Sequence, residues 1–221
     1  MTEEELFRHI CTSSDDPASG LQPPYAPIAF PVHPDEPVDY EAVREEACSA
    51  ALGASDLVHH PSIGAPHIDV FRYPPLGERT YWCYVTSGMF DFPIWLPDGT
   101  YFRSELLAAT HAISNVAPAV LFTLGKMPFA FRTFLHHYHS VPFPQGLPVE
   151  PYTYALLIPP FLAEGLRSFP LFPGQTVTLL QVIPITASER KYAVKYGSRE
   201  FVAQLPDLLS SWLFDGRSGG A

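Results

Sequence analysis

The sequence predicts a single α+β domain in which helices cover a β-sheet. Segments with the two-residue apolar period of strands are interspersed with segments that have the three- to four-residue period of helices. The two kinds of segment do not alternate regularly, which argues against a fold built from repeated βαβ units. Because 47% of the 221 residues are apolar and only 16% are charged, the chain can bury a core without a metal or disulfide staple.

The N-terminal part is predicted to be a separate arm. Residues 11–37 contain seven prolines, which interrupt helices and strands, so residues 1–37 are expected to form an acidic, proline-rich arm. The domain itself is expected over residues 38–214, followed by a flexible tail over residues 215–221. No stretch of the sequence approaches the roughly 20 apolar residues of a membrane span.

The first predicted element is a helix over residues 38–52. Its apolar residues recur at three- and four-residue spacing, Asp39 is placed to cap it and Gly53 to end it. Alternating apolar residues then predict a strand over residues 67–73, and an aromatic, β-branched segment predicts another over residues 80–86. We expect these two strands to pair through the short loop between them.

The middle of the chain is predicted to contain one strand and two helices. Residues 102–110 fit a strand or a short helix, and we favour a strand. Helical spacing follows over residues 117–124 and again over residues 128–139, and Gly125 is predicted to separate the two helices. Pro128 fits the first turn of the second helix, where a missing N–H costs nothing.

The C-terminal part is predicted to alternate buried strands with capped helices. Residues 152–158 and 176–183 have the continuous apolar character of strands inside a sheet. Thr186 and Glu189 have the spacing of a capping box and predict a helix start, and Gly197 predicts where that helix ends. A last helix, interrupted by a proline, is expected over residues 199–213.

Charge is concentrated at the N-terminus. Residues 1–50 hold 11 acidic residues against only Arg8 and Arg44, and so supply most of the net charge of −10. This charge disfavours nucleic acid and anionic membrane surfaces as partners. The acidic segment can serve as a solvated leader or as a docking patch for a basic protein.

The cysteines and the N-terminus indicate a cytoplasmic location. The three cysteines are odd in number and far apart: Cys11, Cys48 and Cys83. Such spacing argues against a disulfide framework. The first ten residues carry Glu3, Glu4 and Glu5, where a secretory signal would be basic and then apolar.

Histidines are the main candidates for metal chemistry. His59, His60, His67 and Asp69 lie within eleven residues of sequence, and His67 and Asp69 share one face of a predicted strand. A second group contains His136, His137 and His139, which lack the four-residue spacing of a zinc-binding helix. We interpret His136 and His137 as helix-end residues and expect no bound metal or cofactor. The alternative is a metal-dependent hydrolase that uses His67, Asp69 and His139.

Polar turns offer few candidates for catalysis. Ser87 precedes Gly88 at the end of a predicted strand, outside any Gly-x-Ser-x-Gly pattern, and is expected to be a turn serine. Cys83 lies within an aromatic strand, where a thiol is usually a small buried hydrophobe. The Asp98–Gly99 pair predicts a turn that places a carboxylate on an exposed loop, where binding residues often occur. We therefore expect no enzymatic activity.

Several segments, in this order and spacing over about residues 35–210, resemble the suppressor-of-fused domain family. The segments are His67–Val70, Tyr73–Pro75, Tyr84–Met89 with Asp91, Glu105–Leu106, His139–Pro142, Leu156–Pro160 and Leu179–Thr186 with Glu189, Arg190 and Gly197. The resemblance implies an α+β domain with a mixed β-sheet flanked by helices. It also implies a non-enzymatic protein-binding module.

The family resemblance also suggests partners. The family's animal regulator holds Gli-type transcription factors with this domain and a second one. The present chain resembles the shorter bacterial members, some of which are proposed to be immunity proteins that neutralise toxins. Asp98 falls in the loop whose carboxylate grips the peptide in the animal domain, and Pro93 stands where its tyrosine is expected. Asp91 and Asp98 are the predicted partner-binding residues. A structural or oligomerisation domain remains the third reading.

Overall fold

The structure is a computed structural model that describes most of the predicted domain. The described residues are 39–60, 67–91, 94–95, 101–131, 133–143, 149–161, 166–172, 175–205 and 213–215. The arm over residues 1–37, the Asp98–Gly99 turn and most of the tail lie outside them. The predicted boundaries of the arm and the tail therefore stay predictions.

An eight-stranded mixed sheet forms the centre of the molecule. Its order is β1-β2-β3-β6-β10-β8-β7, and β9 pairs with β10 off this path. The strands are β1 (Leu57–His59), β2 (Asp69–Tyr73), β3 (Trp82–Ser87), β6 (Ser104–Thr110), β7 (Ser140–Pro142), β8 (Tyr154–Ile158), β9 (Ser168–Phe172) and β10 (Gln175–Ile185). β6 and β10 run parallel, whereas the other described neighbours run antiparallel. A separate two-stranded sheet pairs β4 (Ile94–Trp95) with β5 (Tyr101–Phe102).

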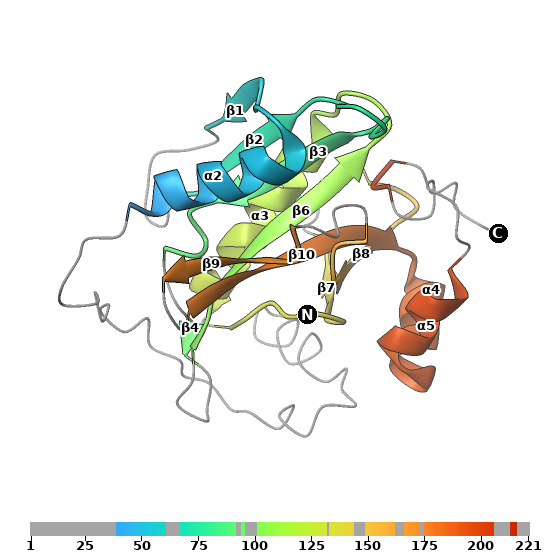
Figure 1. The fold of residues 1–221 in the computed structure, drawn as a ribbon. Helices are drawn as coiled ribbons and strands as arrows, with labels where there is room; N and C mark the ends of the chain where they lie inside the picture. Colours follow the sequence, from blue (N-terminus) through green and yellow to red (C-terminus); the bar gives the residue numbers. More distant parts are fainter. Residues whose placement is uncertain are drawn as a thin grey trace.

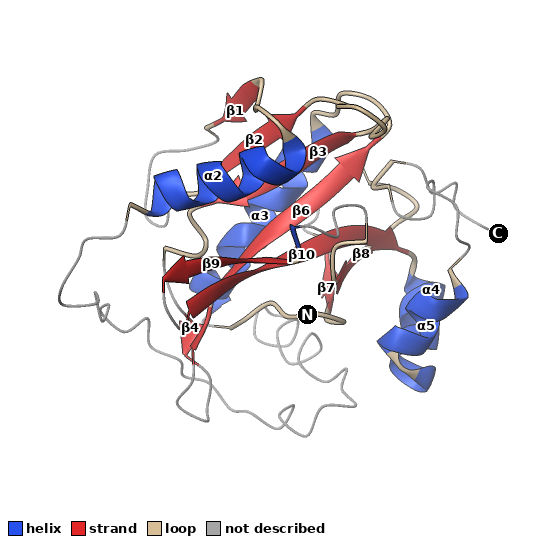
Figure 2. Cartoon of the chain, viewed as in Figure 1, coloured by secondary structure: helices blue, strands red, loops and turns tan. Residues whose placement is uncertain are grey.

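Helices cover both faces of this sheet (Figures 1 and 2). They are α2 (Tyr40–Leu52), α3 (Val116–Phe131), α4 (Ala187–Tyr196) and α5 (Ser198–Gln204). Leu180 and Val182 of β10 pack in the cluster that contains the buried side of α3. Leu179 packs in the cluster of α2, and Ile183 in that of α4 and α5. Because side chains alternate along a strand, α3 occupies one face and the other three helices share the opposite face.

Local signals predicted several elements correctly. Asp39 caps α2 by accepting a hydrogen bond from the amide of Ala42 at 3.0 Å, and Gly53 ends the helix with φ 81°. The predicted capping box of α4 is present, with reciprocal bonds between Thr186 and Glu189, and Gly197 ends that helix. β2 and β3 pair antiparallel as expected. The α+β class and the mixed sheet with flanking helices are confirmed.

The prediction of two helices over residues 117–139 is wrong. A single helix, α3, runs through both Gly125 and Pro128. Gly125 lies where the helix meets the sheet, since a Cβ there would be 3.1 Å from Met89 Sδ. Pro128 falls near the C-terminal end of the helix, where it removes only one backbone hydrogen bond. Packing against the sheet therefore outweighs both local breaks.

The segment after α3 is not helical where it is described. Residues 133–139 form an irregular connection, in which Tyr138 has a positive φ of 70°. His136 and His137 consequently do not sit at a helix end, so the dipole explanation for them is wrong. The last helix, α5, begins one residue before its predicted start and ends at Gln204. The rest of its predicted length is largely outside the described residues.

Candidate functional site

A sharp turn over residues 87–91 follows β3 and leads to Asp91, one of the predicted binding residues. Residues 87–90 of this turn are buried, and Asp91 is half-buried. Ser87, the last residue of β3, pairs with Asp69 at the start of β2. The next residue, Gly88, has φ 110°, and a Cβ there would overlap the backbone carbonyl oxygen of His67. Only glycine fits both conditions. The 87–91 turn is therefore pressed against the segment that leads into β2.

The side chain of Glu105 holds the 87–91 turn from inside the domain. Glu105 lies on β6, is fully buried, and accepts hydrogen bonds from the amides of Gly88 at 3.0 Å and Phe90 at 3.1 Å. Its second carboxylate oxygen pairs with the hydroxyl of Thr86. The Thr86 hydroxyl also accepts a bond from the amide of Leu106 at 2.7 Å. One carboxylate thus accepts from two backbone N–H groups of the turn, which lie beyond the end of β3.

The burial of Glu105 has an electrostatic consequence. Desolvation raises the pKa of Glu105 from 4.5 to about 7, although the bonds from Thr86 and Phe90 oppose the rise. The negative charge of Asp91 adds to the increase, and Arg44 acts against it. A second buried side chain, Arg103, donates to the carbonyl of Phe90. The turn is consequently fixed by polar contacts from two neighbouring residues of the chain, Arg103 and Glu105.

The structure places one of the two predicted binding residues at this turn. Asp91 is half-buried at the end of the 87–91 turn. Asp98 lies outside the described residues, so its place relative to the turn is not described. Ser87 is buried as the last residue of β3, directly before the turn.

The two described cysteines are buried and weakly acidic. Burial raises the pKa of Cys48 to about 11 and that of Cys83 to about 12. The thiolate is the reactive form of cysteine, and these values keep it scarce at neutral pH. Both residues therefore act as small core side chains.

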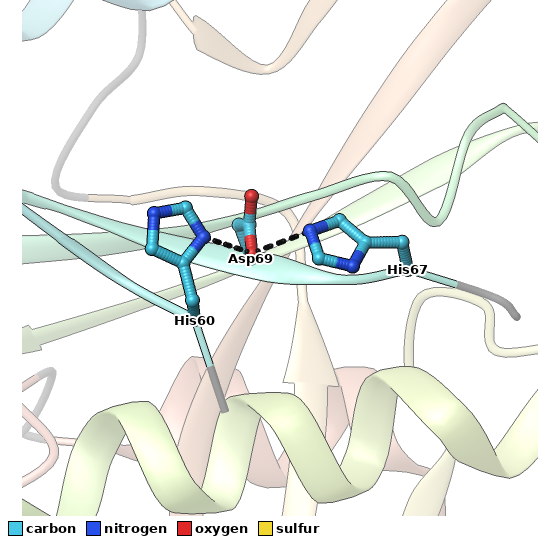
Figure 3. A group of neighbouring side chains, drawn as sticks. All are labelled: His60, His67 and Asp69. Atoms are coloured by element: carbon cyan, nitrogen blue, oxygen red, sulfur yellow. Dashed lines mark hydrogen bonds and ion pairs between the residues drawn. The ribbon is translucent and has the colours of Figure 1, made fainter. Parts of the chain in front are cut away.

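A compact group of two histidines and one aspartate lies beside the turn (Figure 3). Oδ1 of Asp69 is 2.8 Å from Nδ1 of His60 and 3.0 Å from Nε2 of His67. The antiparallel pairing of His59 in β1 with Val70 in β2 brings His60 beside Asp69. Among the described residues, only this group brings three potential metal ligands within 4.8 Å of one another.

The alternative hydrolase needs His139 beside His67 and Asp69, and His139 does not join them. His139 precedes β7, whereas Asp69 begins β2, and these strands are five strand spacings apart in the sheet order. At about 4.8 Å per spacing, the separation is roughly 24 Å. His139 instead contacts the rings of Phe134 and His136, at centroid distances of 5.3 and 5.9 Å.

Two features of the site escaped the sequence analysis. Glu105 was noted only as part of a family motif, although a lone acidic residue in a run of apolar ones is a signal for a buried polar role. The contact of His60 with Asp69 is the second, because the sequence does not predict the short strand β1 that precedes His60. The strand pairing that brings His60 to Asp69 leaves no local pattern in the sequence.

Fold and site together define the class as an α+β domain whose central mixed sheet leads into a tight turn held by a buried glutamate. A family model described as Suppressor of fused protein matches residues 64–217. This match covers more than half of the chain, so the chain belongs to the suppressor-of-fused family.

Solved structures share this fold at low sequence identity. A suppressor-of-fused homologue from Neisseria gonorrhoeae FA 1090 matches with TM-score 0.63 and 16% identity, over 82% of this chain and 96% of that one. Drosophila Suppressor of Fused matches with TM-score 0.62 and 15% identity, over 82% of this chain and 51% of that one. A structure of the Sufu–Fu complex matches with TM-score 0.61 and 15% identity, over 82% and 92%. No curated protein sequence matches the chain.

The described helices include none with the length and apolar character needed to cross a membrane.

Proposed function

We propose that the chain is a cytoplasmic protein-binding module that acts without bond-breaking chemistry. Membership of the suppressor-of-fused family supports this proposal, as does the fold shared with a Sufu–Fu complex. The observation that carries it is the 87–91 turn, which Glu105 holds from inside the domain. A turn fixed before binding loses little conformational entropy when a partner docks.

We propose that the contact surface includes the half-buried end of the 87–91 turn, at Asp91. Asp91 ends the turn and is one of the two candidate contact residues; Asp98 is the other. A carboxylate at the edge of a rigid turn can accept charge-assisted hydrogen bonds from a partner's arginine or lysine.

The finer form of the proposal is that the chain is an immunity protein which neutralises a toxin. The resemblance to short bacterial members of the family supports this role, and a homologue from Neisseria gonorrhoeae shares the fold. The net charge of −10 favours a basic partner. Complementary charge raises the association rate and the selectivity for such a partner more than the net affinity.

Crosslinking and affinity capture in the source cells, followed by reconstitution, test the binding function. We expect one protein to be captured and then to bind the purified full chain at a defined stoichiometry. Failure of every captured protein to bind the purified chain with a Kd below about 100 μM would contradict a binding function.

Co-expression tests the immunity role separately. The captured partner, expressed alone, should arrest growth, and the chain should restore it. A partner that binds but is harmless would overturn the immunity role and leave the binding function standing.

A further inference from the structure

The exposed group formed by His60, His67 and Asp69 has the composition and geometry of a metal site. We propose that it binds one divalent ion of the late first transition series, such as Zn²⁺, Ni²⁺ or Co²⁺. This inference is independent of the proposed function. It also replaces the sequence-based expectation that no metal is bound.

The distances between the ligand atoms are close to those that a metal requires. Zinc binds imidazole nitrogen at about 2.0–2.1 Å and carboxylate oxygen at about 2.0–2.2 Å, so tetrahedral ligands lie about 3.3 Å apart. The two nitrogens lie 2.8 and 3.0 Å from Oδ1 of Asp69. An ion therefore needs each nitrogen to move only a few tenths of an ångström away from this oxygen. The two nitrogens, which lie within 4.8 Å of each other, must also come to about 3.3 Å.

The side chains have the freedom to make this adjustment. His60 is 64% exposed and His67 is 57% exposed, whereas Asp69 is only 15% exposed and is fixed in strand β2. Both imidazoles direct a nitrogen at the same carboxylate oxygen, as Figure 3 shows. On binding, each neutral imidazole gives a lone pair to the ion and keeps its proton on the other ring nitrogen.

The donor set selects the class of metal. Two imidazole nitrogens and one carboxylate oxygen suit zinc and its neighbours, whereas Mg²⁺ and Ca²⁺ prefer oxygen ligands alone. Three protein ligands leave at least one coordination position for water or for a side chain of another molecule.

The position of the group links it to the 87–91 turn. His60 follows β1, and Asp69 begins β2. The carbonyl of His67 lies against Gly88, and Asp69 pairs with Ser87. A bound ion would tie the end of β1 to the start of β2, and so brace the segment on which the turn rests. Binding to the folded chain should therefore raise its melting temperature.

Calorimetric titration of the full chain, free of any histidine tag, with ZnCl₂ and NiCl₂ tests the site. We expect one equivalent to bind with a Kd in the micromolar range, about 1–10 μM. His60→Ala and His67→Ala should each weaken binding by at least about tenfold. Asp69→Asn should do the same, and the two exposed histidine variants carry the test if Asp69→Asn does not fold.

His111 provides a matched control. It is a similarly exposed histidine, and its Nδ1 is 3.3 Å from Oδ1 of Asp215, without a second histidine in the pair. His111→Ala should change the affinity by less than about twofold. The proposal is overturned if binding does not saturate below about 1 mM metal. It is also overturned if His60→Ala and His67→Ala lose no more affinity than His111→Ala.

Discussion

Glu105 shows how one buried residue can determine the shape of a turn between two strands. Its carboxylate accepts hydrogen bonds from the amides of Gly88 and Phe90 and from the hydroxyl of Thr86. A buried carboxylate is costly to ionise, and that cost appears as the pKa of about 7. The same contacts that shape the turn therefore make the stability of the domain depend on pH.

The glutamine variant of Glu105 tests this dependence. The raised pKa means that the folded chain holds a proton which the unfolded chain releases between about pH 4.5 and pH 7. This contribution to the free energy of unfolding falls, by on the order of 3 kcal/mol, as the pH rises through that interval. Glu105→Gln cannot ionise and should lack the fall, so its stability relative to wild type should improve between about pH 5 and pH 8.

Urea unfolding of the wild type and of Glu105→Gln at about pH 5 and about pH 8 measures this effect. In the variant, the amide oxygen can still accept from both backbone amides, and the NH₂ group can donate to Thr86. Parallel pH dependence in the two proteins would contradict a neutral-range pKa for Glu105.

Gly88 gives a second test at the scale of one residue. Gly88→Ala would combine a positive φ of 110° with an overlap on the carbonyl oxygen of His67. We expect it to lower the free energy of unfolding by about 3 kcal/mol or more. Gly77→Ala is the matched control, because Gly77 has φ 59° and open space around its Cβ position. Its cost should be near 1 kcal/mol. Equal losses in thermal or urea unfolding would contradict the close approach at Gly88.

At the scale of elements, helix ends are stabilised locally while helix paths are decided by packing. The capping box at Thr186 begins α4 just after β10 ends, so the strand passes directly into the helix. Thr186→Ala should remove about 1 kcal/mol of stability. Thr186→Ser keeps the hydroxyl and should lose much less in the same urea unfolding experiment. A serine variant as unstable as the alanine variant would contradict the capping role.

The same contrast explains which elements the sequence could predict. The starts of α2 and α4 depend on side chains within three residues, and both were predicted correctly. The path of α3 depends on packing against the sheet, where Gly125 lies close to Met89 and Ile68 from distant parts of the chain. The group of His60, His67 and Asp69 depends on the three-residue strand β1, which is too short to leave a periodic signal in the sequence. Contacts between distant segments therefore account for the errors.

At the scale of the whole molecule, uneven charge is the property most relevant to partner choice. Most of the negative charge belongs to residues 1–50. Within the described part of this region, Glu45 and Glu46 are exposed on α2. A basic partner would be drawn to this end of the chain before it docks.

Charge neutralisation tests this attraction once the partner is in hand. The variant replaces with glutamine Glu3, Glu4, Glu5, Glu41, Glu45 and Glu46. We expect the association rate to fall by about tenfold at low salt, with little change in the unfolding midpoint. Stopped-flow mixing at two salt concentrations measures both rates, and an unchanged rate at low salt would contradict the attraction.

The most direct test of the central claim compares how tightly the captured partner binds two variants, in each of which an amide replaces one carboxylate. The two carboxylates lie at opposite ends of the β2–β3 hairpin. Asp91→Asn changes the carboxylate at the 87–91 turn, and Glu78→Gln changes an exposed carboxylate at the opposite end of the hairpin. If the chain binds a protein at this turn, Asp91→Asn should lower the affinity by at least about tenfold in a calorimetric titration. Glu78→Gln should change the affinity by less than about twofold. Equal affinities for wild type and a folded Asp91→Asn variant would contradict the claim.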